Sequence, residues 1–379
     1  MAVYLNTNKN LENYKELYNE EYFVDKSKIM SLINKKINTK SKYLCITRPR
    51  RFGKSSIANM LGAYYSKAVD SKDIFDNLDV SNCESYKENL NKYNVITISF
   101  TDVNNNYKNC DEYIDRIIQL LIQDLKEVFP NIKIKPNYAI WDILNELNEK
   151  FIFIFDEWDY IFNRNLYLEE QDKFLEFLMK LLKDKSYVAL CYMTGILPIK
   201  KYSTGSALNM FDEYTFLKDR IFDEYFGFTS EEVISLCEKN DEIKFSELEN
   251  WYNGYLTIKG KKIYNPRSVV KALQNKHCES YWTNTGAMDE VAEYLKYKTM
   301  EIREDVIELV SGGEIDIIIN EEFRAGQEAP KTKKEIYSAM IILGFLSYHD
   351  GYLKIPNKEL MLEFEKALAD ESFGYKKER

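Results

Sequence analysis

The sequence predicts an α/β protein in which helices flank a parallel β-sheet, followed by a second, mainly α-helical domain. The first half of the chain contains short, continuous apolar runs, as expected for strands buried on both faces of a parallel sheet. Helical patterns separate these runs, and strands that alternate with helices are typical of α/β folds. The runs span residues 42–47, 95–100, 151–155 and 187–193.

The predicted helices carry apolar residues three and four positions apart, which places these residues on one helix face. The first helical pattern follows the run at 42–47 closely, so the local order is strand, loop and helix. Two more follow the second and third runs. The apolar positions are Ile57, Met60, Leu61, Tyr64 and Tyr65; Tyr113, Ile114, Ile117, Ile118, Leu121 and Leu125; and Phe174, Phe177, Leu178, Leu181 and Leu182.

The second domain is predicted from a change of pattern at about residue 228. FTSEEVISLC combines a serine or threonine cap with an acidic first turn, and Asn265 before Pro266 marks another helix start. Asp350 and Gly351 join two short strand-like runs, which is a strong hairpin signal. We therefore expect a first domain at 1–228, a mainly helical, winged-helix-like domain at 229–360 and a short tail at 361–379.

The composition is that of a folded protein, because 45% of the 379 residues are hydrophobic and 30% are charged. A net charge of -9 argues against long-range attraction of the whole surface to nucleic acid. Six widely spaced cysteines without a CxxC pair, and only two histidines, argue against a zinc site or a disulfide framework. No run reaches the roughly 18 apolar residues of a membrane span, so we expect a soluble, cytoplasmic protein without a membrane partner.

Residues 48–55, RPRRFGKS, match the Walker A pattern G-x-x-x-x-G-K-[ST] at every fixed position except the first, where Arg48 replaces glycine. Backbone N–H groups in the second half of such a loop bind phosphate. Gly53 lets the backbone approach the anion, Lys54 reaches the outer phosphates, and the Ser55 hydroxyl is a ligand for Mg²⁺. A surface turn with basic residues is the alternative. The predicted nucleotide-binding residues are Arg50, Arg51, Phe52, Gly53, Lys54, Ser55 and Ser56.

A second motif, FIFIFDEWD, ends a buried strand further along the chain and matches a Walker B motif. The carboxyl end of a strand is where ligands bind in open α/β sheets. Asp156 would hold Mg²⁺ through its water shell, and Glu157 would polarise an attacking water as a general base. Acidic residues that simply face solvent are the alternative. Asp159 either takes part in the chemistry or caps the next helix.

The fourth apolar run ends in MTG, which places Thr194 where P-loop ATPases carry a polar residue that senses the γ-phosphate or positions water. A helix cap is the alternative interpretation. Hydrolysis also benefits from an arginine that stabilises charge in the transition state, and the candidates are Arg50, Arg51, Arg164 and Arg220. The predicted catalytic residues are Lys54, Glu157 and Thr194, and the predicted metal ligands are Ser55 and Asp156.

A series of blocks runs from FVDKSKIM and RPRRFGKSS through DEWDYIF, TGILPIKKYS, FGFTSEE, WYNGY, YNPRSV, YWTNTG and GFLSYHDGYL to IPNKEL. In this order the blocks resemble the bacterial AAA-ATPase-like family of P-loop ATPases, and Arg48 is that family's own form of the loop. The resemblance implies a P-loop NTPase fold of the additional-strand, catalytic-glutamate type, with the family roles on Lys54, Ser55, Asp156 and Glu157. It also implies a PD-(D/E)XK nuclease domain after the last block, where the sequence shows no such pattern, so we expect no nuclease activity from this chain.

The aromatic segments at 251–255 and 281–286 are either core packing between helices or a contact with a nucleotide or partner. For the whole chain we expect an ATPase that uses ATP and Mg²⁺, releases ADP and phosphate, and works as a nucleotide-dependent switch. The alternative is a nucleotide-binding scaffold or sensor with little turnover that recruits nucleic acid or a protein partner through its second domain. A third interpretation is a phosphotransferase for a small acceptor.

Overall fold

The computed structural model describes residues 2–102, 107–199, 208–239, 242–282, 300–319, 323–324, 330 and 332–369. Contacts between residues divide the chain into two units. The first unit comprises Met1–Thr47 and Lys54–Tyr214, and the second comprises Arg48–Gly53 and Thr215–Arg379. The phosphate loop at 48–53 therefore belongs with the second unit, although the chain on either side of it belongs to the first.

The first unit is built on a parallel sheet of β1 (Tyr43–Thr47), β2 (Asn94–Ser99), β3 (Phe151–Asp156), β4 (Val188–Gly195) and β5 (Asp212–Tyr214). The spatial order is β2-β3-β4-β1-β5, so β4 is the additional strand between β1 and β3. Every residue of β1, β3 and β4 is buried, which explains why their sequences are uninterrupted apolar runs. The four predicted strands are confirmed. Strand β5 was not predicted, because the short segment Asp212–Tyr214 is polar and partly exposed.

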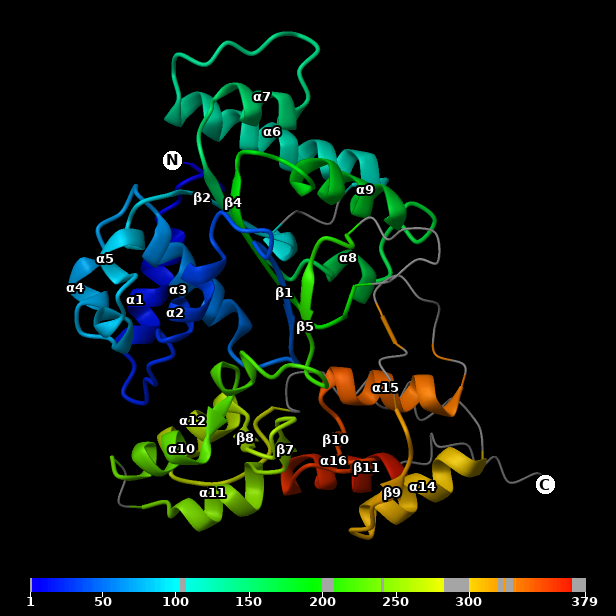
Figure 1. Cartoon of the computed structure of the whole chain (residues 1–379). Helices are drawn as coiled ribbons and strands as arrows, with labels where there is room; N and C mark the ends of the chain where they lie inside the picture. Colours follow the sequence, from blue (N-terminus) through cyan, green and yellow to red (C-terminus); the bar gives the residue numbers. More distant parts are fainter. Residues whose placement is uncertain are drawn as a thin grey trace. The chain divides into compact units, whose positions relative to one another are not determined.

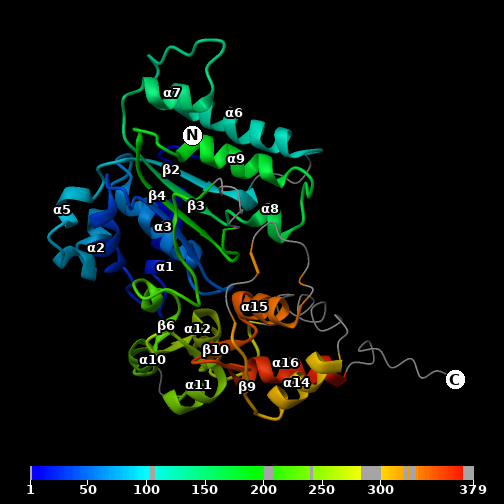
Figure 2. The same ribbon diagram turned by 45° about the vertical axis from the view of Figure 1, so that its right-hand side comes forward.

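Helices cover both faces of this sheet (Figure 1 and Figure 2). They are α1 (Lys9–Tyr18), α2 (Ile29–Ile33), α3 (Lys54–Tyr65), α4 (Lys72–Phe75), α5 (Tyr86–Asn89), α6 (Cys110–Val128), α7 (Ile140–Glu146), α8 (Tyr160–Asn163) and α9 (Gln171–Leu182). On one face α3 packs against α1 and contacts β2, β3 and β4, and on the other α6 packs against α9. Within the described ranges of the chain, no helix combines the length and the apolar character needed to cross a bilayer.

The second unit contains α10 (Ser230–Cys237), α11 (Phe245–Tyr252), α12 (Pro266–Asn275), α14 (Met300–Val310), α15 (Lys333–Leu343) and α16 (Lys358–Ala369). The predicted helix starts are confirmed. The Thr229 side chain accepts a bond from the N–H of Glu232 at 3.3 Å, and the Glu232 carboxylate accepts one from the N–H of Thr229 at 2.8 Å. Asn265 caps α12 through its side-chain oxygen, with Pro266 as the first residue of the helix.

Two small antiparallel sheets accompany these helices. One consists of β6 (Phe228–Thr229), β8 (Lys262–Tyr264) and β7 (Tyr255–Leu256), and the other of β10 (Ser347–His349), β11 (Tyr352–Lys354) and β9 (Ile315–Asp316). The predicted hairpin is confirmed, since Asp350 and Gly351 join β10 to β11 with φ of 49° and 91°. The prediction of a mainly helical second part is confirmed, and the short strands β6, β7, β8 and β9 were not predicted because two or three residues are too few to show a periodic pattern.

The aromatic segments of the second unit serve as core. Tyr252 and Tyr255 are fully buried, and their hydroxyls donate to the carbonyls of Glu279 at 2.8 Å and Gly344 at 2.6 Å. Trp282 stacks on Phe345 with ring centroids 5.7 Å apart. The packing interpretation thus holds for these residues, while residues 283–286 and 370–379 lie outside the described part of the chain.

Gly62 allows α1 and α3 to approach closely, because a Cβ at this position would lie 2.2 Å from the Asn10 amide nitrogen. We expect Gly62→Ala to destabilise the protein, since overpacking costs about 1–3 kcal/mol and the gain in helix propensity is only about 1 kcal/mol. An Asn10→Ala background removes the two closest approaches, those to the Asn10 side-chain amide, so the same substitution should cost less there. Urea unfolding of the four proteins measures both costs. Equal costs in the two backgrounds would contradict this account.

Candidate functional site

The carboxyl ends of β1, β3 and β4 meet at one edge of the parallel sheet. Asp156 at the end of β3 pairs with Thr194 of β4, and Thr47 at the end of β1 pairs with Gly195 of β4. Adjacent strands lie about 4.8 Å apart, so these residues form one contiguous row. The predicted Walker B acid and the polar residue after the fourth run are therefore neighbours at the edge where open α/β sheets bind ligands.

The backbone of the phosphate loop includes left-handed residues, as the glycine in its sequence suggests. Arg51 and Gly53 both adopt left-handed conformations, with φ of 70° and 85°. A Cβ at Gly53 would meet no heavy atom within 4 Å, so glycine is needed here for its backbone conformation and not for lack of space. The open space beside Gly53 gives an anion access to the backbone, and α3 begins with the next residue, Lys54. The N–H groups and dipole at a helix N-terminus favour phosphate.

Lys54, Ser55 and Asp156 come together within the first unit. Lys54 is buried with 8% of its surface exposed, and the Ser55 hydroxyl donates a hydrogen bond to the Asp156 carboxylate. Burial raises the pKa of Asp156 above its ordinary value of 3.8, while the Ser55 hydrogen bond and the Lys54 ammonium oppose this shift. The structure thus places the predicted lysine and the two predicted metal ligands side by side.

Glu157 lies in a tight turn directly after β3. Its φ of 49° is left-handed, which is a strained conformation for a residue other than glycine. Its N–H donates to Asp156 at 3.1 Å, and the N–H of Trp158 donates to the Thr194 carbonyl at 3.2 Å. Trp158 is fully buried and packs against Phe162, with ring centroids 5.6 Å apart. These contacts hold the half-buried Glu157 at the point where the chain leaves the sheet.

Asp159 stabilises the chain that follows β4. One carboxylate oxygen accepts hydrogen bonds from the N–H groups of Ile196 at 2.9 Å and Leu197 at 2.7 Å and from the Asn163 amide at 2.7 Å. Burial raises the pKa of Asp159, and these hydrogen bonds and the Lys54 charge oppose the shift. Asp159 occupies the N-cap position of α8, as one of the two interpretations expected, but its side chain makes no capping bond to the helix backbone.

Thr194 is fully buried in β4 and pairs with Asp156. Its hydroxyl has no hydrogen-bond partner among the described residues, and the same holds for the second oxygen of Asp159 and the indole nitrogen of Trp158. A buried polar group without a partner costs about 1–3 kcal/mol. No helix begins at residues 195–199, so Thr194 is not a helix cap in this part of the chain.

The predicted arginines differ in their surroundings. Arg50 is half-buried, while Arg51, Arg164 and Arg220 are exposed. The sequence marked Arg48 as a departure from the loop pattern but gave no sign of its ion pair with Asp219, in which the Arg48 side chain is 2% exposed. The general P-loop pattern offers no signal for this pair, because the two residues are far apart in sequence.

The residues at this edge fit Mg²⁺ together with a bound phosphate. Mg²⁺ takes few protein ligands and keeps several waters, so the Ser55 hydroxyl and the Asp156 carboxylate form a sufficient protein contribution. Burial disfavours the charged form of Asp156, which is a further reason for a cation here. Dedicated clusters of three or more His, Cys, Asp or Glu side chains with metal-binding geometry are absent from the described residues.

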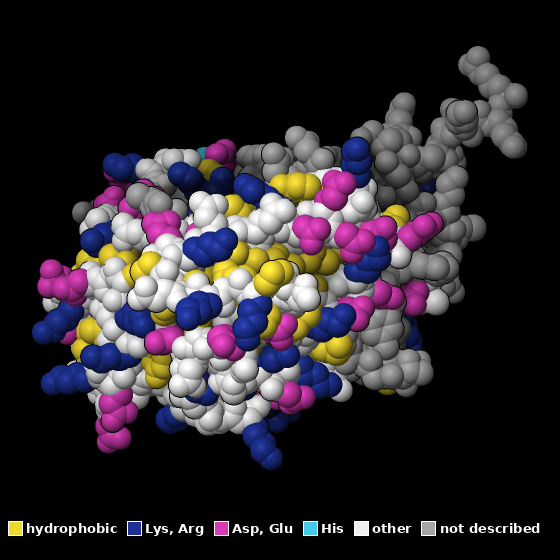
Figure 3. All heavy atoms as spheres, turned by 90° about the horizontal axis from the view of Figure 1, so that it is seen from above, with side chains coloured by type: hydrophobic (Ala, Val, Ile, Leu, Met, Phe, Trp, Pro, Cys, Tyr) yellow, Lys and Arg dark blue, Asp and Glu magenta, His cyan; other side chains and the backbone are white. Residues whose placement is uncertain are grey.

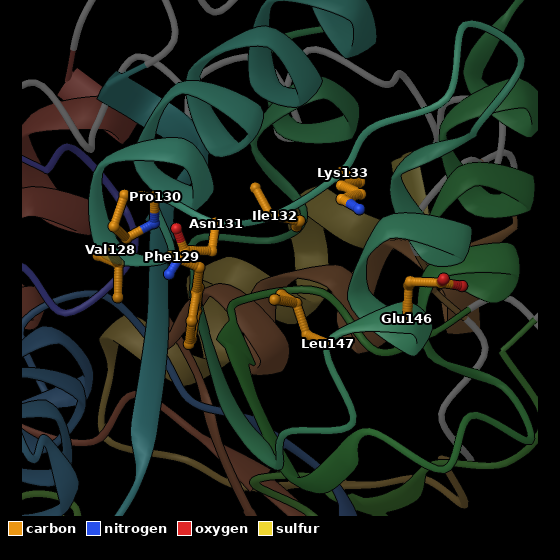
Figure 4. A pocket seen from close by; sticks show the side chains of 8 residues that line it. All are labelled: Val128, Phe129, Pro130, Asn131, Ile132, Lys133, Glu146 and Leu147. Atoms are coloured by element: carbon orange, nitrogen blue, oxygen red, sulfur yellow. The ribbon is translucent and has the colours of Figure 1, made fainter.

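A surface hollow of about 460 Å³ lies between the end of α6 and α7 (Figure 4). Its lining includes Phe129, Lys133 and Glu146 and none of the predicted site residues. The Phe129 ring lies 6.4 Å from that of Phe151, the first residue of β3, whereas Asp156 is the last. The hollow therefore lies toward the amino end of β3, away from the edge that holds Lys54 and Asp156.

The sheet order, the loop and the paired carboxylates agree with the comparison to known families. The family model described as "Predicted AAA-ATPase" matches residues 10–204. The chain belongs to the AAA-ATPase-like family. Its fold is that of a P-loop NTPase of the additional-strand type followed by a mainly helical part.

Individual relatives are distant. The "Uncharacterized protein in vnfD 5'region" of Azotobacter chroococcum mcd 1 is 24% identical over 277 residues, which cover 70% of this chain and 51% of the relative. The chain thus spans about half the length of this relative. A Walker-type ATPase of Pyrococcus abyssi is 14% identical, with a TM-score of 0.44 over 92% of this chain and 99% of that one. The ORC2 protein of Aeropyrum pernix is 11% identical, with a TM-score of 0.36 over 94% and 98%.

The raised pKa of Asp156 predicts how stability depends on pH. Folding takes up a proton at pH values between 3.8 and the raised pKa, so the stability contributed by this group falls as pH rises through that window. Asp156→Asn carries no charge, so we expect it to raise the Tm of the nucleotide-free protein near neutral pH, with a gain that shrinks as pH falls toward 3.8. Thermal unfolding followed by circular dichroism across this range measures the difference.

The matched control for this experiment is Asp115→Asn, because Asp115 is exposed on α6. It should leave the Tm nearly unchanged at every pH. A gain in Tm for Asp156→Asn that stays constant with pH would show that the buried charge is not its cause.

Proposed function

We propose that this chain binds ATP with Mg²⁺ at the carboxyl edge of its parallel sheet and hydrolyses it to ADP and phosphate. The observation that carries the proposal is the hydrogen bond from Ser55 to the buried Asp156, with Lys54 beside both. This arrangement joins a helix N-terminus, a cationic side chain and a hard oxygen ligand pair in one place. Each is a known requirement of phosphoryl transfer from a nucleotide.

The loop and Lys54 would bind the nucleotide. The N–H groups of residues 50–56 would contact the phosphates, and Gly53 leaves the space for this approach. The Lys54 ammonium would stabilise negative charge on the outer phosphates. Ser55 and Asp156 would hold Mg²⁺, which neutralises charge on the phosphate oxygens when bound.

Glu157 would accept the proton of the attacking water. Its strained backbone and the hydrogen bonds of the turn fix its position next to Asp156 while leaving the side chain half-buried. Thr194 would position the water or contact the γ-phosphate. The residue pairs with Asp156 in the sheet, and its buried hydroxyl can donate a hydrogen bond that no described residue accepts. Asp159 would hold the backbone after Thr194 through Ile196 and Leu197.

We also propose that residues 229–360 form a winged-helix-like domain that carries partner binding. Helix α14, strand β9, helix α15 and the hairpin β10–β11 follow one another, and β9 pairs with β11 as the third strand of the sheet. Figure 3, seen from the side of α6 and α7, mixes Lys and Arg with Asp and Glu on that face. The net charge of the chain is -9, which does not favour non-specific binding of nucleic acid, so a protein partner is the better candidate.

Glu157→Gln tests the chemistry separately from binding. Loss of a general base lowers the rate by about 10²–10⁴-fold, so we expect phosphate release to fall by this factor while the Kd for ATP stays close to that of the wild type. Lys54→Ala should instead weaken ATP binding. The control is Glu169→Gln, an exposed glutamate whose loss should change neither quantity. Equal phosphate release from the wild type and Glu157→Gln would remove Glu157 from the reaction.

Thr194→Val tests the unpartnered hydroxyl. A hydrogen bond to a charged group is worth about 1.5–3 kcal/mol, so its loss in the transition state should reduce kcat roughly 10- to 100-fold. Stability should stay equal or rise, because the substitution removes a buried polar group without a partner among the described residues. Thr97→Val is the opposite control: Thr97 accepts a bond from Asn10 at 2.7 Å, so its loss should lower stability and spare kcat. A Thr194→Val protein with lowered stability and unchanged kcat would make the role of Thr194 structural.

A further inference from the structure

Arg48 occupies the position where the general P-loop pattern has glycine, and its side chain is one of the largest fully buried side chains of the chain. We propose that Arg48 is a positioning residue that ties the phosphate loop to residues 215–227, so that nucleotide binding at the loop and the conformation of this segment are coupled. The inference rests on the proposed function, because it needs a nucleotide at the loop. It assigns a role to the one Walker A position at which this chain departs from the general pattern.

The first anchor is the ion pair between Arg48 and Asp219. The two side chains are 2% and 1% exposed, so both charges are buried. The other oxygen of Asp219 accepts hydrogen bonds from the N–H groups of Ile221 at 2.7 Å and Phe222 at 2.9 Å. The Arg48 guanidinium also lies over the Phe226 ring, 4.9 Å from its centroid. Arg48 is thus held by a carboxylate that is itself fixed by backbone bonds.

The second anchor is Phe52, four residues further along the loop. Its ring is fully buried and contacts the rings of Phe216 and Tyr255, with centroids 5.7 Å and 5.1 Å away. Its carbonyl accepts a hydrogen bond from the N–H of Gly227 at 3.1 Å. The segment 215–227 therefore contacts the loop near both of its own ends, through Phe216 and Gly227.

Pro49 adds a third contact within the same unit. A Cβ at Gly344, directly after α15, would lie 2.6 Å from the Pro49 Cβ, so the two residues are in close contact. The Gly344 carbonyl in turn accepts the hydrogen bond from the Tyr255 hydroxyl. The anchors of the loop therefore extend to the end of α15.

The anchored residues lie on either side of the loop tip, residues 50 and 51, where the phosphates would bind. Residues 48, 49 and 52 are buried, whereas Arg50 is half-buried and Arg51 exposed. A loop held on both sides of its tip loses little conformational freedom when it binds an anion. By linkage, a ligand that prefers this loop conformation must stabilise the anchors, and loss of the anchors must weaken the ligand. A glycine at position 48 would lack the first anchor.

Hydrogen–deuterium exchange on the full chain tests the coupling. The nucleotide is a non-hydrolysable ATP analogue with Mg²⁺ at saturating concentration, and its Kd is measured by equilibrium dialysis. We expect the analogue to slow amide exchange in residues 215–227 of the wild type. In the double variant Arg48→Met/Asp219→Asn this protection should disappear and the Kd should weaken at least about tenfold, with kcat at saturating ATP changed much less.

The double variant avoids an unpaired buried charge. Asp219→Asn also keeps one side-chain oxygen that can accept from the N–H groups of Ile221 and Phe222. Arg48→Lys keeps the positive charge and should recover part of the protection. The control is Arg116→Met on α6, an exposed arginine whose loss should leave binding and protection as in the wild type.

Three results overturn the inference. If the analogue binds the wild type but exchange at 215–227 does not change, the coupling is absent while the proposed function stands. If protection persists in the double variant at saturation, the nucleotide acts on the segment by another route. If no analogue binds the wild type, the proposed function fails and the coupling with it.

Discussion

A carboxylate removed from water organises the functional edge of the first unit. The pKa of Asp156 is raised by burial even though the Ser55 hydroxyl, the Lys54 ammonium and the Glu157 N–H all favour its charged form. The remaining cost is what a divalent cation would offset. Thr194, whose hydroxyl has no hydrogen-bond partner among the described residues, pairs with Asp156 in the sheet register. Three buried polar groups without a partner among the described residues, on Thr194, Asp159 and Trp158, therefore lie at or directly after the ends of β3 and β4.

Much of this edge could be predicted from the sequence, because its parts depend on local patterns. Strands β1, β3 and β4 are buried on both faces, so their apolar runs are continuous and their ends are visible. In a parallel sheet those ends lie on one side, so a GKS motif after one strand and a DE pair after another must approach each other. The contact between Ser55 and Asp156 follows from these two facts.

The rest depends on tertiary contacts that leave no local pattern. Strand β5 is short and polar and joins the sheet only by pairing with β1. Asp159 has the sequence context of a helix cap, but its burial beside Ile196 and Leu197 turns it into an acceptor for the chain after β4. The partner of Arg48 lies 171 residues away, at Asp219. A deviation from a motif shows that a position differs, and only the fold shows what it contacts instead.

The loop at 48–53 belongs to a different unit from the chain on either side of it, and this determines which contacts could carry the effect of a bound nucleotide. Lys54 and Asp156 take their positions from the first unit, whereas Arg48 and Phe52 take theirs from the second. A ligand shifts a conformational equilibrium only through differential contacts with its states. In the coupling proposed above, a ligand at the loop would act on residues 215–227 through Arg48 and Phe52, whose contacts with that segment all lie within the second unit.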